Sequence, residues 1–207
     1  MTETRRGLAL FGGSFNPPHR SHRRIAEDAL RLLPVAELRV LPAGDHPHKH
    51  HRDMATASHR LAMCQITFAG LANCFVDDCE LRRKGPSFTV DTLQELRLAV
   101  PDRELFFLIG SDNLPLLPSW HNHHRILQLA RVVTFPRLGY AINAEELRGK
   151  DLTAAERASL LDMVLPTAVD EISSSELRAR LLRGERQLAE LPAGVEDYIH
   201  THQSYGG

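Results

Sequence analysis

The fold is decided by a stretch close to the start of the sequence, Gly12-Gly13-Ser14-Phe15-Asn16-Pro17-Pro18-His19-Arg20-Ser21-His22. The apolar run at residues 7–11 precedes it and is typical of a strand buried on both faces of a parallel sheet. Two prolines then stiffen the turn, and an amphipathic helix follows straight after it. Its apolar stripe consists of Ile25, Ala26, Ala29, Leu30 and Leu33.

This strand, glycine turn and helix start have the properties of an anion site. The glycines at positions 12 and 13 let the backbone turn sharply and approach a bulky polar ligand. Free N–H groups and the positive end of the helix dipole favour a phosphate there. His19 and His22 are three residues apart, so both can reach the same group. Taken alone, an ordinary turn with two surface histidines explains these residues equally well.

Composition narrows the class of protein. The chain has 207 residues, 43% hydrophobic and 25% charged, which suits one folded domain over residues 1–207. A formal net charge of −1 argues against a broad nucleic-acid surface. No apolar run approaches the roughly 20 residues of a membrane span, and the run at 7–11 is too short for a signal peptide, so we expect a cytoplasmic protein.

Cysteine and histidine usage does not predict a metal centre. The three cysteines lack paired CxxC spacing and are interpreted as reduced thiols. The histidine-rich run at 46–51 contains no thiolate, so adventitious metal affinity explains it better than structural zinc. We therefore assign no metal ligands.

Strands and helices alternate along the rest of the chain. We expect strands at 37–42, 74–81, 104–109 and 130–135. Helices are expected from Ser58, as the cap, to about residue 69, from the hydroxyls of Ser87 and Thr89 onward, and from 141 to about 161. Ser173 with Glu176 predicts a capping box and a last helix that runs towards Gly184.

Three further polar segments are candidates for ligand binding. Gly110 and Asp112 follow a buried strand, and ligands of open α/β sheets bind at such carboxyl ends, so this turn should lie near the glycine turn. Trp120 lies in a polar loop, where an indole can stack on a planar ring or serve as a half-buried anchor. The hydroxyls of Ser87 and Thr89 suit an anion, although simple helix capping also explains them.

The glycine turn resembles the signature of the nucleotidyltransferase superfamily, in which an HxGH element contacts ATP phosphates. Here Ser21 occupies the glycine position of that element, and Asn16 stands where Asp is commoner. Residues 172–178 resemble the Ile-Ser-Ser-Thr-x-x-Arg motif of the same superfamily, with Ser175 in the threonine position.

Other segments resemble the bacterial nicotinate-nucleotide adenylyltransferases in particular. They are the Pro-His-Lys segment at 47–49 with the Arg-Leu-x-Met helix start at 60–63, the Pro-Ser-Phe-Thr segment at 86–89 with Thr92 and Leu93, the Gly-x-Asp at 110–112, Trp120, the Arg-x-Gly-Tyr at 137–140, and the closing segment at 191–199. The resemblance therefore extends from residue 7 to residue 199 and is weakest between 141 and 161.

The resemblance implies a single Rossmann-like α/β domain with a mostly parallel sheet and helices on both faces. It implies an adenylyltransferase that joins nicotinate mononucleotide to ATP, giving deamido-NAD and pyrophosphate. Implied catalytic groups are His19, His22, Lys49 and Arg178. The resemblance implies that ATP contacts His19, His22 and Arg178. It also implies ATP contacts from residues of the glycine turn, the turn after residue 109 and the start of the last motif: Gly12, Gly13, Ser14, Phe15, Gly110, Asp112, Ile172, Ser173 and Ser174. Implied contacts to the mononucleotide are Lys49, Thr89, Asp112, Trp120 and the backbone of His121.

The expected partners are ATP, with Mg²⁺ bridging its phosphates, and nicotinate mononucleotide. No nucleic-acid or membrane partner is expected, and a homo-oligomer is left open. Three alternatives remain: a sister adenylyltransferase acting on nicotinamide mononucleotide or phosphopantetheine, a metal-dependent hydrolase built on the histidine run, and a nucleotide-binding module without catalysis.

Overall fold

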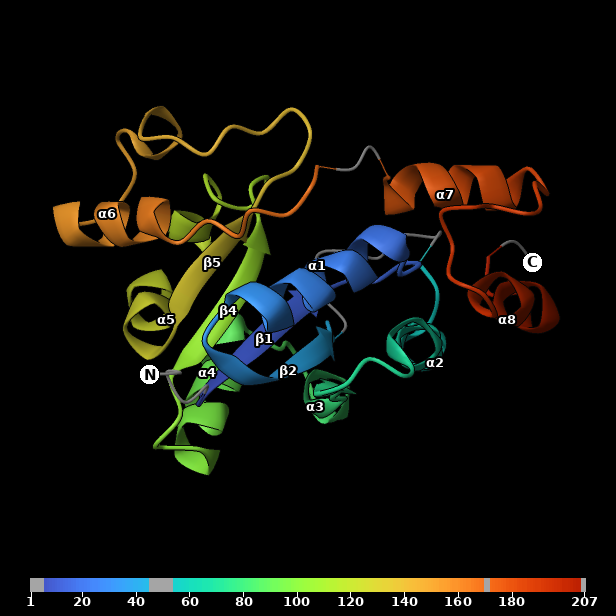
Figure 1. The fold of residues 1–207 in the computed structure, drawn as a ribbon, viewed down its shortest axis with the longest axis horizontal. Helices are drawn as coiled ribbons and strands as arrows, with labels where there is room; N and C mark the ends of the chain where they lie inside the picture. The colour runs from blue at the N-terminus through green and yellow to red at the C-terminus, as the bar shows by residue number, and fades with distance from the viewer. Residues whose placement is uncertain (1–5, 45–53, 170–171, 206–207) are drawn as a thin grey trace.

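The computed structural model describes residues 6–44, 54–169 and 172–205. Five parallel strands form one sheet in the order β3-β2-β1-β4-β5 (Figure 1). These strands are β1 (Gly7–Gly13), β2 (Val35–Pro42), β3 (Cys74–Val76), β4 (Leu105–Gly110) and β5 (Arg131–Phe135). The chain builds outward from β1 in one direction to β3 and then in the other to β5, so the strand order reverses between β1 and β4.

Helices cover both faces of the sheet, and α7 and α8 lie at one end of the molecule beside α2 (Figure 1). The helices are α1 (Arg20–Leu32), α2 (Ala57–Phe68), α3 (Cys79–Arg82), α4 (Thr89–Ala99), α5 (His123–Leu129), α6 (Ala154–Asp162), α7 (Ser174–Leu182) and α8 (Val195–His202). Two 3₁₀ turns are η1 (Leu117–Ser119) and η2 (Glu145–Leu147). The predicted α/β class, with a parallel sheet between helices, is confirmed.

Two separate cores lie on opposite faces of the sheet. Leu8 and Leu10 of β1 point into the core under α4 and α5. Ala9 and Phe11 point into the core under α1 and α2. This split follows from the alternation of side chains along a strand. The central strands are buried on both faces, as their unbroken apolar sequences predict.

Three predicted elements have different bounds in the structure. The strand predicted at 74–81 ends at Val76, because Asp77 accepts a hydrogen bond from the backbone N–H of Cys79 at 3.0 Å and turns the chain into α3. The helix predicted over 141–161 is mostly irregular, and only η2 and α6 form within it. The predicted glycine turn starts later than expected, because Gly12 and Gly13 are the last residues of β1 and pair with β2.

The capping expected at three helix starts differs in the structure. Thr56, not Ser58, caps α2, with its hydroxyl accepting from the N–H of His59 at 3.4 Å. The N-cap residue of α4 is Phe88, whose side chain makes no hydrogen bond to the helix. The hydroxyl of Ser87 instead accepts a hydrogen bond from the guanidinium of Arg83. Ser173 is the N-cap of α7 as predicted, but its side chain makes no capping bond, so the predicted box is absent.

In the part of the chain that the structure describes, no helix has the length and apolarity needed to cross a bilayer.

Candidate active site

The carboxyl end of β1 approaches Phe107 of β4 on one face and Phe15 on the other. A Cβ at Gly12 would lie 3.5 Å from the Phe107 ring, and one at Gly13 would lie 3.1 Å from the Phe15 ring. The glycine at position 13 therefore lets Phe15 pack directly against the end of the strand. Ser14 is exposed after it.

Phe15 forms the floor beneath the histidine pair. Its backbone has φ +46°, a rare conformation for a bulky residue. Its ring is only 2% exposed and packs edge-on to Phe11 and His22, with centroids 5.4 and 5.0 Å apart. Phe15, which the resemblance assigns to ATP binding, can therefore offer a ligand its backbone but not its ring.

His19 and His22 lie together at the start of α1, with ring centroids 3.8 Å apart. The backbone N–H of His19 donates to Nδ1 of His22 at 3.1 Å. Burial lowers the pKa of His22 well below its usual value of 6.5, and the nearby His19 and Arg137 lower it further. His22 is therefore neutral at neutral pH. Because its Nδ1 accepts a hydrogen bond, its proton is on Nε2.

The start of α7 is joined to the same turn by two hydrogen bonds. Ser174 donates from Oγ to the carbonyl oxygen of Pro17 at 3.0 Å, and Arg178 donates from Nη1 to that of Asn16 at 2.8 Å. Arg178 also donates from Nη2 to Ser175 Oγ at 3.2 Å. The two helix starts that the motifs identify are therefore adjacent, although about 150 residues separate them in sequence.

Asn16 anchors this turn to two other segments. Its side-chain oxygen accepts from the N–H of Ala55 at 3.1 Å and from the hydroxyl of Tyr205 at 2.7 Å. Arg60 of α2 is fully buried and donates from Nη1 to the carbonyl oxygen of Ser14 at 3.0 Å. Contacts from three elements thus fix the backbone between β1 and α1.

The carboxyl end of β4 supplies a carboxylate and a guanidinium. Asp112 Oδ1 is buried, makes no hydrogen bond, and lies 3.5 Å from Nε of Arg137. Gly110 leaves room for both side chains in these positions, because a Cβ on it would collide with Asp112 Oδ1 and lie 3.0 Å from Arg137 Cδ. Buried Ser111 holds the backbone of Arg137, accepting from its N–H at 2.8 Å.

Trp120 and α4 belong to the core on the other face of the sheet. The half-buried indole packs edge-on to Phe107 with centroids 6.1 Å apart. His121 is exposed, and its ring lies 4.5 Å from that of Phe88, the N-cap of α4. Thr89 is the first residue of that helix, so Thr89 and His121 belong to neighbouring segments.

The structure thus brings His19, His22, Ser174 and Arg178 together at the turn after β1. Trp120 and His121 contact Phe107 and Phe88 instead, in the part of the molecule on the other face of the sheet. Ser173 is exposed at the start of α7, and Ile172 immediately precedes it. Lys49, which was predicted to bind phosphate, lies outside the residues that the structure describes.

Sequence reasoning missed two arginines of this region. Arg137 follows β5 and acts electrostatically on His22, and Arg60 supports Ser14. The Arg-x-Gly-Tyr resemblance at 137–140 could have indicated Arg137. Arg60 gave no local signal beyond its place in a helix-start motif.

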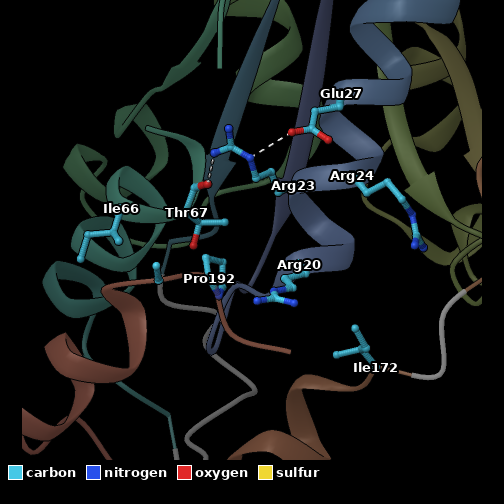
Figure 2. A pocket seen from close by; sticks show the side chains of 9 residues that line it. Arg20, Arg23, Arg24, Glu27, Ile66, Thr67, Ile172 and Pro192 are labelled. Atoms are coloured by element: carbon cyan, nitrogen blue, oxygen red, sulfur yellow. Dashed lines mark hydrogen bonds and ion pairs between the residues drawn. The ribbon is translucent and has the colours of Figure 1, made fainter. Parts of the chain in front are cut away.

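A cavity of about 600 Å³ lies on the outer side of α1 (Figure 2). Arg20, Arg23 and Arg24 of α1 are among its lining residues, together with Ile172, and the side chains of Arg23 and Arg24 leave the helix in different directions (Figure 2). Arg23 is already engaged there by Glu27 and by the carbonyl oxygen of Thr67, at 3.0 and 2.7 Å. Neither histidine of the pair lines this cavity, so we do not assign it to the site.

Comparisons with known proteins agree with this geometry. The family model described as cytidylyltransferase-like matches residues 10–180. A probable nicotinate-nucleotide adenylyltransferase of Albidiferax ferrireducens is 39% identical over 96% of this chain and 97% of its own length. One of Thermomicrobium roseum is 35% identical over 96% of this chain and 91% of its own length.

A solved structure has the same fold. The nicotinic acid mononucleotide adenylyltransferase of Plasmodium falciparum complexed with NaAD superposes with a TM-score of 0.75 at 19% identity, covering 96% of each chain. The histidine turn, the start of α7 and the full-length relatives point to the same conclusion. The chain belongs to the cytidylyltransferase-like family and, within it, to the nicotinate-nucleotide adenylyltransferases.

Proposed function

We propose that this protein transfers the adenylyl group of ATP to nicotinate mononucleotide, giving deamido-NAD and pyrophosphate. The observation that carries the proposal is the junction of α1 and α7, where the His19–His22 pair and Arg178 are held together through Pro17 and Asn16. Two helix N-termini with imidazole, hydroxyl and guanidinium donors suit a polyphosphate. The full-length relatives, which are probable nicotinate-nucleotide adenylyltransferases, support the pyridine mononucleotide as the second substrate.

The reaction needs no nucleophile from the protein. A 5′-phosphate oxygen of the mononucleotide forms a bond to the α-phosphorus of ATP, while the bond from that phosphorus to the bridging oxygen breaks and pyrophosphate leaves. Rate then comes from placing two polyanions in line and from stabilising the charge that develops on the phosphates. ATP enters as its Mg²⁺ complex, so the ion accompanies the substrate and offsets part of its charge.

His22 is suited to donate a hydrogen bond to the α-phosphate. Its bond from the His19 N–H leaves the proton on Nε2, and its lowered pKa keeps the ring neutral before ATP binds. A neutral donor adds no repulsion to the neighbouring His19 and Arg137. Its position is fixed by Phe15 beneath it, which preorganises the bond.

Arg178 and Ser174 are proposed to bind the phosphates that leave. In the structure both side chains donate to backbone carbonyl oxygens of the turn. The phosphates of ATP would compete with these carbonyl oxygens for the same donors, which already point towards the site. Gly12, Gly13, Ser14, Ser173, Ile172 and the backbone of Phe15 complete the proposed ATP contacts. Lys49 is proposed as a further cation for phosphate on the basis of its motif alone.

The second substrate is proposed to bind on the Trp120 side. The half-buried indole would stack on the pyridine ring, and Thr89 with the backbone N–H of His121 would bind its carboxylate. Asp112 is proposed for ribose hydroxyls or adenosine, because its buried Oδ1 makes no hydrogen bond and a hydroxyl could supply one. Gly110 leaves the room that this carboxylate needs. We propose that the enzyme works in the cytoplasm as one domain.

The test is pyrophosphate release from ATP, measured separately with nicotinate mononucleotide, nicotinamide mononucleotide and phosphopantetheine. We expect release with the nicotinate compound at a kcat/KM well above that with the other two. A preference for either of the others would assign a sister activity. Binding of ATP without release in any arm would overturn the proposed reaction.

A further inference from the structure

A second group of potential ligands lies outside the proposed active site, where α5 faces the segment before α6. His123 and His124 are the first two residues of α5, and Asp151 precedes α6. One ligand atom from each of these three residues lies within 4.8 Å of the other two. The two imidazoles and one carboxylate thus converge from segments that are 28 residues apart.

The two distances from the carboxylate to the histidines are a few tenths of an ångström longer than those of a tetrahedral metal site, and all three ligand atoms lie within 4.8 Å of one another. Nε2 of His124 lies 3.6 Å from Asp151 Oδ2, and Nε2 of His123 lies 3.9 Å from the same oxygen. Zinc bonds of about 2.0–2.1 Å place neighbouring tetrahedral ligands about 3.3 Å apart. The Asp151 side chain is 80% exposed, so its carboxylate can move the few tenths of an ångström required.

His124 is oriented by a carboxylate behind it. Its Nδ1 lies 2.7 Å from Glu156 Oε1, so this nitrogen donates and the neutral ring keeps a lone pair on Nε2, the atom that faces Asp151. Glu156 is itself fixed by the capping box of α6, in which Thr153 N–H donates to its other oxygen at 2.7 Å. A carboxylate that holds a ligating histidine in this way is a recurrent support of zinc sites.

His123 is held in front of the same carboxylate. Its side chain is 10% exposed, and its ring lies 4.0 Å from that of His124. Its Nε2 donates to the carbonyl oxygen of Asp151 at 2.7 Å. Binding of a cation at Nε2 requires this hydrogen bond to break: the proton of Nε2 moves to Nδ1, the ring stays neutral, and the exposed segment that carries Asp151 shifts its carbonyl oxygen out of the way.

We propose that His123, His124 and Asp151 bind one divalent transition-metal ion of the zinc class, with Glu156 as a positioning residue. Imidazole with a single carboxylate favours Zn²⁺, Co²⁺ or Ni²⁺ over Mg²⁺ and Ca²⁺, which prefer sets of oxygen ligands. A bound ion cross-links the start of α5 to the segment that leads into α6. This proposal does not rest on the proposed adenylyl transfer.

The histidine run at 46–51 could bind metal adventitiously, so the test starts from a background with His46→Gln, His50→Gln and His51→Gln. Zn²⁺ is titrated calorimetrically into this full-length protein, and Co²⁺ binding is followed by the visible absorption of a tetrahedral complex. We expect one equivalent of Zn²⁺ and a tetrahedral Co²⁺ spectrum. Mg²⁺ in excess should not displace either ion.

Four single substitutions in this background decide the assignment. His124→Gln and Asp151→Asn should each abolish the Co²⁺ spectrum and the stoichiometric Zn²⁺ binding. Glu156→Gln should keep the spectrum while weakening Zn²⁺ affinity by roughly 10-fold to 100-fold. His200→Gln is the matched control, because His200 also faces a glutamate, at 3.6 Å, and should leave binding unchanged.

Circular dichroism identifies any variant that fails to fold, and the exposed Asp151 makes Asp151→Asn the least disruptive of the four. Equal Zn²⁺ stoichiometry and affinity in the background protein, His124→Gln and Asp151→Asn would overturn the site. A loss of binding in His200→Gln as large as in His124→Gln would overturn it too.

Discussion

Arg178 donates a hydrogen bond from Nη1 to the backbone carbonyl oxygen of Asn16 at 2.8 Å, across 162 residues of sequence. The other arm of the guanidinium donates to Ser175 on the same helix, so the side chain is held while it bridges the junction between α1 and α7. Replacing Arg178 therefore tests the junction and the proposed phosphate site together.

Arg178→Ala should lower kcat/KM for ATP by roughly 100-fold, the scale of losing a preorganised charged donor. Arg178→Lys should recover little of this loss, because an ammonium cannot reproduce two directed N–H donors. Steady-state kinetics with varied ATP will measure the effect, with exposed Arg186→Ala as the control. Full recovery in the lysine variant would show that charge alone is needed.

His22→Ala should lower kcat by roughly 100-fold or more while the fold persists. The reason is the loss of the Nε2–H donor that the His19 N–H bond orients. Kinetics with both substrates saturating, compared with His200→Ala on α8, will check this. Near-normal turnover would remove His22 from the chemistry.

Trp120→Ala should mainly raise the KM for nicotinate mononucleotide and leave the KM for ATP almost unchanged. The indole contributes a stacking face, which the phenyl ring of Trp120→Phe should partly restore. Because Trp120 also packs on Phe107, thermal melting must show that both variants are folded at the assay temperature. An unchanged mononucleotide KM in the alanine variant would rule out stacking.

The lowered pKa of His22 predicts how stability changes with pH. Below the ordinary histidine pKa of 6.5 the unfolded chain takes up a proton at this position, whereas the folded protein does not until the pH reaches the lowered value. The free energy of unfolding should therefore fall as the pH decreases through this window and should be unaffected by His22 above it.

His22→Asn keeps an acceptor for the His19 N–H and cannot titrate in this range. Urea unfolding at a series of pH values should show a shallower decline for this variant than for the unmodified protein. Parallel curves for the two proteins would contradict the shifted pKa.

Arg137→Gln should raise the pKa of His22 towards its usual value, because one of the three causes that lower it is removed. Proton NMR titration of the histidine rings will measure the change. Burial and His19 remain, so the pKa should stay below 6.5. A pKa that does not move would mean that Arg137 does not act on His22.

The sequence predicted the parallel sheet, the histidine pair and the meeting of the two helix starts. Each of these has a strong local pattern: an apolar run, a glycine pair, or serines followed by an arginine. The capping box predicted at Ser173 does not form, and it is the neighbouring Ser174 that bonds, to the carbonyl oxygen of Pro17, a long-range partner that local sequence rules cannot reveal. The role of Arg137 depends on its charge acting on His22, which is 115 positions earlier in the sequence, and no local spacing encodes that relationship.

The two halves of the proposed site rest on different cores. His22 lies over Phe11 and Phe15, whereas Trp120 packs on Phe107, on the opposite face of the sheet. A substitution confined to the core around Phe107 therefore acts first on the proposed mononucleotide side. In evolutionary terms the proposed site is modular, with one set of buried aromatic residues beneath each of the two substrates it is proposed to join.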